Sequence, residues 1–353
     1  MAALQRGTVK ILAYEHHSAR CGAENDIPSC SAFHADRPLH GLLVDLCRVP
    51  GVEVTLLRDP GLAPLHLPGT VRVVSCQPEQ AADTVAACIA EADAVWPVVP
   101  ESAGMLEQAS SQILGCGRLL AGSLPAAIRV AASKRETSRV LKAAGIAVVD
   151  TCWLYEAPPA NASAWVVKPD DGAGCSDTRI FADCDAARSA IAEREAGQYV
   201  MQPYIHGAHR SISMVCADNR VLLMSVDEQR IAVFDNQLQY MGSSVNGVRE
   251  GQSQCRALAE QVMAALPGLW GYVGIDFIMS ANGPVILEVN PRPTVPHAAM
   301  RQSTGHNPAR LMLDLLQGKR CAPLEARRIK PVSIDVSPFP EQPGFRLRGA
   351  AGL

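Results

Sequence analysis

The segment Gly274–Arg292, GIDFIMSANGPVILEVNPR, decides the fold of this chain of 353 residues. It has the pattern of two apolar strands joined by a turn at 281–283. If those three residues form the loop, Asp276 lies opposite Glu288, and the period of two places Asn290 on the same face as Glu288. Like charges that face each other across two strands are destabilising, and the neighbouring residues are too apolar for a solvated edge.

A bound divalent cation would remove this conflict. Two carboxylates and one amide offer only oxygen donors, which suit Mg²⁺ or Mn²⁺. We therefore predict Asp276, Glu288 and Asn290 as metal ligands. The alternative is a hairpin whose polar face simply meets water, and the rest of the chain weighs against it.

The composition limits the class of protein. A length of 353 residues favours two or three subdomains over one core. A hydrophobic content of 48% and a charged content of 19% are typical of a globular chain. The net charge of −3 and the pI near 6.3 provide no basic face, and no apolar run is long enough to span a bilayer. We expect neither nucleic acid nor a membrane as a partner.

The N-terminus and the cysteines bear on location. Lys10 is followed by only four apolar residues, Ile11–Tyr14, which is too short for a signal peptide. The twelve cysteines form no C-x-x-C pair, so the sequence indicates neither a zinc site nor a compact disulfide framework. Dispersed thiols fit a reducing compartment, and we expect a cytoplasmic protein.

The first 125 residues alternate strand and helix patterns. This rhythm predicts a doubly wound, largely parallel sheet in a domain of residues 1–125. The predicted strands are 9–14, 52–57, 71–75 and 94–99, and the predicted helices are 39–48 and 79–92.

Two α+β units are predicted to follow, at 126–205 and 206–320, with a Pro- and Arg-rich tail at 321–353 that wraps the surface or is partly loose. A capping box at Ser133–Glu136 opens a helix. The other expected elements are strands at 164–168, 199–202, 212–215 and 221–226, helices at 185–195, 256–266 and 309–316, and the acidic hairpin.

Two lysines stand where an anion could bind. Lys168 ends a buried strand and enters the loop 169–175, whose two glycines can present backbone N–H groups to phosphate oxygens. The alternative is an exposed loop with a solvated lysine. Lys134 lies in the first turn of its helix, where a cation is unfavourable unless an anion binds or the side chain is exposed.

Two further segments carry polar groups near these lysines and acids. The backbone of Gln202–Gly207 has the pattern of a hinge that could bond to an adenine edge, or of a simple linker. Arg292 is held between two prolines and suits a cation aimed at a transferring phosphoryl group, or a solvated arginine in a rigid loop. His297 and His306 are interpreted as structural.

Four segments together resemble the ATP-grasp superfamily, over roughly residues 125–320. The resemblance implies a doubly wound N-terminal domain followed by a two-subdomain ATP-grasp fold, of class α/β and α+β, with ATP held between the subdomains. The segments are 166–174, 202–205, 274–277 and 287–292.

The resemblance implies a role for each matching residue. The two lysines would contact phosphates, the loop would form a mobile flap, and the hinge backbone would hold adenine. His209 stands where many members carry a Glu that binds ribose, which leaves ribose recognition open. The implied ATP-binding residues are Lys134, Lys168, Gly172, Ala173, Gly174, Cys175, Gln202, Tyr204, Ile205 and His209.

The same resemblance implies the chemistry. Asp276, Glu288 and Asn290 would hold two Mg²⁺ or Mn²⁺ ions, and Arg292 and Lys168 would act in catalysis. No G-x-S-x-G elbow appears, which weighs against a serine nucleophile.

A narrower resemblance concerns the substrates. The segments 10–15, 100–106, 227–231 and 240–242 are similar to the tyramine–glutamate ligases of methanofuran biosynthesis. This implies small-molecule partners, namely a carboxylic acid such as glutamate and an aromatic amine, either tyramine or tyrosine. A homodimer stays open. The alternatives are a ligase for another amino acid or peptide, a kinase, and a nucleotide-binding module without turnover.

Overall fold

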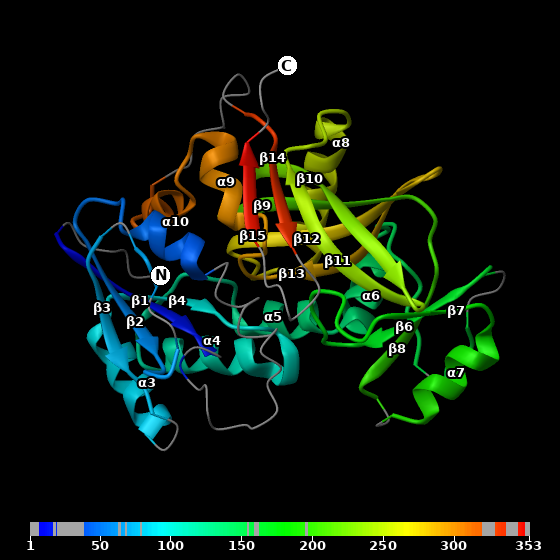
Figure 1. Cartoon of the computed structure of the whole chain (residues 1–353), viewed down its shortest axis with the longest axis horizontal. Coiled ribbons are helices and arrows are strands. Elements are labelled where there is room, and N and C mark those ends of the chain that lie inside the picture. Colours follow the sequence, from blue (N-terminus) through cyan, green and yellow to red (C-terminus); the bar gives the residue numbers. More distant parts are fainter. Residues whose placement is uncertain are drawn as a thin grey trace.

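The structure, a computed structural model, describes residues 7–16, 19, 39–62, 65–67, 69–77, 80–153, 155–158, 162–194, 197–319, 329–336 and 345–349. These residues form a parallel five-stranded sheet and a larger, mainly antiparallel sheet. In Figure 1 the parallel sheet lies on one side of the molecule, a small unit with helix α7 on the other, and the large sheet between them. The predicted fold class is confirmed.

The N-terminal sheet has the strand order β3-β2-β1-β4-β5 with every pair parallel. The central strands β1 and β4 are largely apolar and buried, β4 at all five positions, whereas the edge strand β3 is exposed or half-buried. The predicted strands are confirmed, and the short β5 was not predicted. The elements are β1 (Val9–Glu15), helical residues 39–46, β2 (Val52–Arg58), β3 (Val71–Ser75), α3 (Ala81–Glu91), β4 (Ala94–Val98), η2 (Ser102–Gly104), α4 (Met105–Gly115) and β5 (Leu119–Leu120).

Two helices lead into the small unit. The Ser133 hydroxyl accepts a hydrogen bond from the Glu136 N–H at 3.0 Å, which confirms that Ser133 caps the helix. Trp165 of the sheet packs on Ala187 and Ile191 of helix α7. The elements are α5 (Pro125–Ala132), α6 (Lys134–Ala143), β6 (Trp165–Pro169), β7 (Arg179–Phe181), α7 (Cys184–Ala192) and β8 (Tyr199–Pro203).

The large unit has the strand order β13-β12-β9-β10-β11, and the pair Gln237–Arg179 joins β11 to β7 of the small unit. Helix α8 packs on the β9 and β10 side of the sheet. The elements are β9 (Ala208–Ala217), β10 (Arg220–Phe234), β11 (Gln237–Val245), α8 (Gln252–Ala265), β12 (Gly271–Ser280), β13 (Gly283–Asn290), α9 (His297–Thr304) and α10 (Pro308–Leu316).

The acidic hairpin has the predicted pairing but a different turn. Asp276 faces Glu288, as expected. Ser280, however, pairs with Gly283, so two residues rather than three form the loop, and the register shifts between Asp276 and Phe277. Leu287 is the extra residue of this β-bulge. The expected three-residue loop was wrong, and the bulge restores the pairing of the acids.

Part of the tail is regular structure. The strand β14 (Val332–Val336) pairs with β11, and β15 (Phe345–Gly349) pairs with β14. Arg230 holds β14 by donating Nη2–H bonds of 2.7 Å to the Ile334 carbonyl and the Asp335 carboxylate. A tail that only wraps the surface is therefore a wrong expectation for these residues. In the described part of the chain, no helix is long and apolar enough to cross a membrane.

Candidate nucleotide site

A cavity with about 780 Å³ of open space lies between the small unit and the large sheet. One end is lined by charged side chains and the other by aliphatic ones. The lining residues are Lys134, Val166, Lys168, Pro169, Gly172, Cys175, Ser176, Thr178, Gln202, Pro203, Tyr204, Ile205, His209, Gln229, Ile231, Leu238, Asp276, Ile278, Leu287 and Glu288.

Lys134 reaches the charged end from the first position of helix α6. Its side chain is 5% exposed. Its ammonium donates hydrogen bonds to the carbonyls of Gly172 at 2.6 Å and Asp170 at 3.1 Å, and lies 3.5 Å from a Glu288 oxygen. Lys134 therefore ties the flap to the acidic hairpin, and the exposed-surface alternative does not hold.

Lys168 enters the same end from β6 and is 8% exposed. Burial lowers the pKa of its ammonium to about 8, with the Lys134 charge acting in the same direction and Glu288 opposing it. A buried cation with a depressed pKa gains from an anionic ligand, because the ligand favours its charged form.

The acids Asp276 and Glu288 are half-buried, and their pKa values shift in opposite directions. Burial, and then the facing Glu288 carboxylate, raise the pKa of Asp276 well above its usual range. Burial acts in the same direction on Glu288, but the charges of Lys134 and Lys168 and further groups outweigh it and lower the Glu288 pKa. Proximity of two carboxylates pushes their pKa values apart, which is the conflict that the sequence predicted.

Two amides reach Asp276. The Asn290 side chain donates to one of its oxygens at 3.2 Å, and Gln229 donates to the other at 2.9 Å. The structure thus brings the predicted trio together. Gln229 was missed as a site residue, although it lies in the segment 227–231 that carried the narrower resemblance. Only the sheet order β12-β9-β10, which puts β10 one strand away from β12, brings Gln229 near Asp276.

The other end of the cavity is apolar. The Tyr204 N–H is already bonded to the Ala164 carbonyl at 2.8 Å, so the Tyr204 group left for a ligand is its carbonyl. Gln202 is 2% exposed and donates to the Thr151 hydroxyl at 2.9 Å. His209 is half-buried, and burial, then Lys168, lower the pKa of its imidazole. The aliphatic residues are Val166, Ile205, Ile231, Leu238, Ile278 and Leu287.

The predicted flap is a compact loop over the charged end. Gly174 and Cys175 both have left-handed backbone angles, φ 64° and 62°. The Ala173 carbonyl accepts the Ser176 N–H at 3.1 Å. Burial, and then the Glu288 charge, raise the pKa of the Cys175 thiol to about 12, so the thiol stays neutral. Of the predicted flap residues, Gly172 and Cys175 line the cavity, and Ala173 and Gly174 do not.

Comparison with known families matches residues 131–296 to the ATP-grasp domain and residues 52–128 to the pre ATP-grasp 3 domain. This chain is an ATP-grasp protein. Phosphoribosylamine–glycine ligase from Mycobacterium tuberculosis is 27% identical over 282 residues, which cover 72% of this chain and 65% of the relative. The chain thus spans less than two thirds of the length of the curated relatives that it matches.

Solved structures share the ATP-grasp fold. A chain from Archaeoglobus fulgidus assigned to the ATP-grasp superfamily has a TM-score of 0.69 and 21% identity, with 96% of this chain and 98% of that chain covered. N5-carboxyaminoimidazole synthetase from Staphylococcus aureus, complexed with ADP, has a TM-score of 0.69 and 13% identity, with 94% and 83% covered. These likenesses concern the fold.

The donor set of this ATP-grasp domain fits a hard cation. Two half-buried carboxylates face each other, and a cation between them would remove the repulsion that, after burial, raises the Asp276 pKa. Within the described residues, no group of three or more His, Cys, Asp or Glu side chains gathers as a metal centre. The third donor would therefore be the Asn290 amide oxygen, whose assignment relative to the amide nitrogen follows from its hydrogen bonds.

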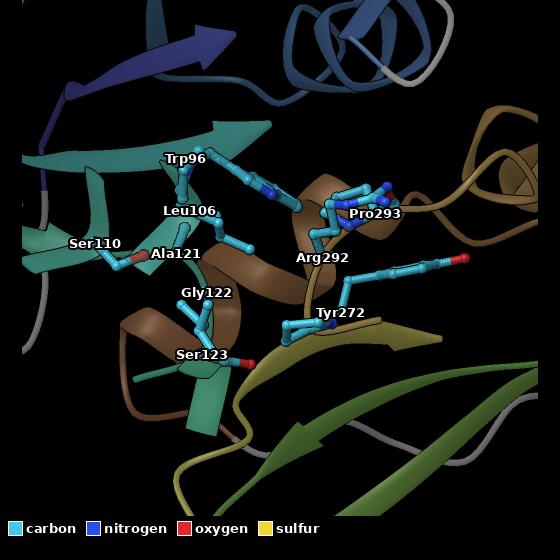
Figure 2. Close-up of a pocket in the computed structure, with 12 residues that line it drawn as sticks. Trp96, Leu106, Ser110, Ala121, Gly122, Ser123, Tyr272, Arg292 and Pro293 are labelled. Atoms are coloured by element: carbon cyan, nitrogen blue, oxygen red, sulfur yellow. The ribbon is translucent and has the colours of Figure 1, made fainter. Parts of the chain in front are cut away.

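Arg292 and Asn290 do not line the nucleotide cavity of the ATP-grasp protein. Arg292 lines a second, small pocket at the junction with the pre-ATP-grasp domain. Figure 2 shows Arg292 beside Pro293, with Trp96 of β4 on one side and Tyr272 of β12 on the other. His297 packs edge-on against both aromatic rings, and burial lowers its pKa to about 4, which fits a neutral structural residue.

Proposed function

We propose that this chain is an ATP-dependent ligase that joins a carboxylate to an amine and releases ADP and phosphate. One observation carries the proposal: a single cavity is lined by aliphatic side chains and by a charged cluster in which two buried lysines face two half-buried carboxylates. Such a site suits a flat apolar base at one end and a phosphate chain with a cation at the other.

The two ends of the cavity bind different parts of ATP. The aliphatic residues pack on adenine, and the ammonium groups of Lys134 and Lys168 bind phosphate oxygens as point charges. Asp276, Glu288 and Asn290 are suited to hold Mg²⁺ or Mn²⁺, which when bound supplies charge neutralisation at the β- and γ-phosphates.

The reaction has two steps. In the first, a carboxylate oxygen attacks the γ-phosphorus, the bond to the β-phosphate oxygen breaks, and ADP leaves. In the second, the amine nitrogen attacks the acyl carbon, phosphate leaves, and the amine gives up a proton. Lys168 and Arg292 stabilise the charge on the acyl phosphate. The flap excludes water, which would hydrolyse this intermediate.

For the substrates, we propose glutamate and tyramine or tyrosine, as in methanofuran-type coenzyme biosynthesis. The segments 227–231 and 240–242 support this, because Gln229 of the first bonds to Asp276 and Tyr240 of the second is half-buried on β11, within reach of the Asp276 charge. The name of the mycobacterial relative also pairs an amine with an amino acid. A ligase for another amino acid or peptide is the alternative, and a nucleotide-binding module without turnover is the second.

The test is product analysis. The purified chain is incubated with ATP, Mg²⁺ or Mn²⁺, glutamate and a panel of tyramine, tyrosine and aliphatic amines, while ADP and amide are measured. We expect ADP and amide in equal amounts, with glutamate and an aromatic amine both required. ADP with a stable phosphoester would indicate a kinase. Nucleotide binding without ADP formation for any acid and amine pair would refute the ligase.

A further inference from the structure

One turn of the N-terminal domain contacts both the flap and Arg292. The turn is Glu101–Gly104, directly after β4. The Ser102 hydroxyl donates to the Asp171 carbonyl at 3.0 Å, and the Ala103 N–H donates to the Asp171 carboxylate at 2.7 Å. The Arg292 Nε–H donates to the Glu101 carboxylate at 2.7 Å. The four-residue turn therefore contacts both the flap, where Asp171 lies 68 positions after Ala103, and Arg292, which lies 191 positions after Glu101.

The contact with Arg292 is a buried ion pair. The Glu101 side chain is 6% exposed and that of Arg292 is 17% exposed. The second Glu101 oxygen is buried and accepts no hydrogen bond from the described residues. Because neither charge can turn to solvent, the carboxylate fixes the guanidinium, and loss of one partner leaves the other buried without compensation.

The contact with the flap bears on the shape of the turn. Ala103 has φ 52° and Gly104 has φ 68°, both left-handed, which is unfavourable for the alanine. In this conformation the Ala103 N–H meets the Asp171 carboxylate, a charge-assisted bond that offsets the strain. The turn is therefore expected to relax when the flap leaves, and Glu101 begins the same turn.

The chain offers an internal control. Glu107 pairs with Arg129 in the same region, between helices α4 and α5, with an Nε–O distance of 2.9 Å. Arg129 is 71% exposed, so this pair is worth little. It has the same chemistry as the pair Glu101–Arg292 but touches neither the flap nor β13.

We propose that the turn Glu101–Gly104 is a latch that positions Arg292 when the flap closes. Asp171 is the flap contact, and Glu101 is the positioning residue. The latch rests on the proposed function in one respect, namely that Arg292 acts on the acyl phosphate. Its consequence is that the guanidinium is fixed only when the loop that excludes water is in place.

The first experiment needs no turnover. Hydrogen exchange of the full chain is measured by mass spectrometry, with and without Mg²⁺–ATP, in peptides covering 101–104, 170–176 and 290–294. We expect Asp171→Asn to raise exchange in all three peptides by about tenfold, the effect of losing a charge-assisted hydrogen bond. Ser102→Ala gives the same pattern at smaller size, and Asp185→Asn, an exposed acid of α7, gives none.

The second experiment uses the substrates that prove active. Glu101→Gln lowers kcat by about 10- to 100-fold through misplacement of Arg292, with KM for ATP within twofold of the parent. In an Arg292→Lys background the same substitution has little further effect, because both changes break one interaction. Glu107→Gln leaves both constants unchanged.

The latch is overturned if Asp171→Asn loosens only peptide 170–176 and leaves 290–294 as in the parent chain. It is equally overturned if the effects of Glu101→Gln and Arg292→Lys simply multiply. Failure of the proposed function would give a different result. Asp171→Asn would still raise hydrogen exchange in all three peptides, with or without nucleotide, but no pair of acid and amine would yield ADP.

Discussion

The charged end and the apolar end of the nucleotide cavity differ in the side chains that line them and in how those side chains interact. The charged end gathers Lys134, Lys168, Asp276 and Glu288 from a helix, a strand of the small unit and both strands of the hairpin. The apolar end is lined by aliphatic side chains such as Ile231 and others from the sheet. Without a ligand, the charged end holds acids whose pKa values are pushed apart and a lysine with a depressed pKa, whereas the apolar end carries no such conflict.

This difference separates stability from function. Like charges at the charged end would be stabilised by a bound cation and phosphates, so changes there should affect binding and turnover more than folding. Changes at the apolar end remove packing and should weaken nucleotide affinity without altering its dependence on the cation.

The largest effect is expected for Glu288→Gln. The amide keeps the size of the side chain but removes a cation ligand, and ADP formation should fall by more than about 100-fold. The melting temperature should stay within a few degrees, because relief of the repulsion with Asp276 offsets the loss of the attraction to Lys134 and Lys168. ADP release and thermal unfolding are measured together.

The control for that change is Glu228→Gln, an exposed acid one residue before Gln229 on β10. It should leave ADP formation as in the parent chain. Near-normal turnover in Glu288→Gln would contradict the assignment of the charged end.

The next effect concerns pH and Lys168. Its pKa is lowered from 10.5 to about 8 by burial, so between these values the unfolded chain binds more protons than the folded one. The free energy of unfolding should therefore rise with pH in this window. ATP affinity, which needs the charged ammonium, should fall above pH 8 by up to about tenfold per pH unit.

Calorimetry from pH 7 to 9.5 measures this dependence. Lys168→Arg should bind ATP with a nearly flat profile, because the guanidinium stays charged. An equal decline in the parent chain and in Lys168→Arg would assign the titration to another group.

A smaller effect tests the apolar end. Ile231→Ala removes methyl groups that line the cavity and should weaken ATP binding by about tenfold. The ratio of affinities with and without Mg²⁺ should remain that of the parent chain. If this substitution alters the cation dependence, the two ends are not separable. Val233→Ala, at a site 51% exposed on the same strand, should leave binding unchanged.

The smallest effect is expected at the helix that presents Lys134. Ser133→Ala removes the N-cap hydrogen bond to Glu136 and should cost about 1 kcal/mol of stability in denaturant unfolding. ATP affinity should change by less than twofold, since the flap carbonyls still hold Lys134. A loss of affinity as large as that of Ile231→Ala would show that the cap positions the phosphate end directly.

The sequence was informative where the decisive pattern is local. Strand alternation placed Asp276 opposite Glu288, and the capping box placed Ser133 at a helix start. The two-residue turn with its bulge at Leu287 was missed, because a loop of two residues plus a bulge and a loop of three give the same pairing of the acids.

Contacts between segments that are far apart in the chain could not be predicted from the sequence. Neither the bond from Gln229 to Asp276 nor the pair Glu101–Arg292 follows from periodicity, since each depends on how whole elements pack. The predicted roles of all the site residues stay predictions, and four of these residues lie outside the lining of the nucleotide cavity, namely Ala173, Gly174, Asn290 and Arg292.

The bulge has a further consequence. In a regular strand, neighbours point to opposite faces, yet Leu287 and Glu288 both line the cavity. The boundary between the aliphatic and the charged parts of the lining thus falls at the β-bulge of β13. Deletion of Leu287 alone would leave a regular hairpin with a two-residue loop in which Glu288 still faces Asp276. The aliphatic contribution of β13 to the cavity would then be lost while the acid pair is kept.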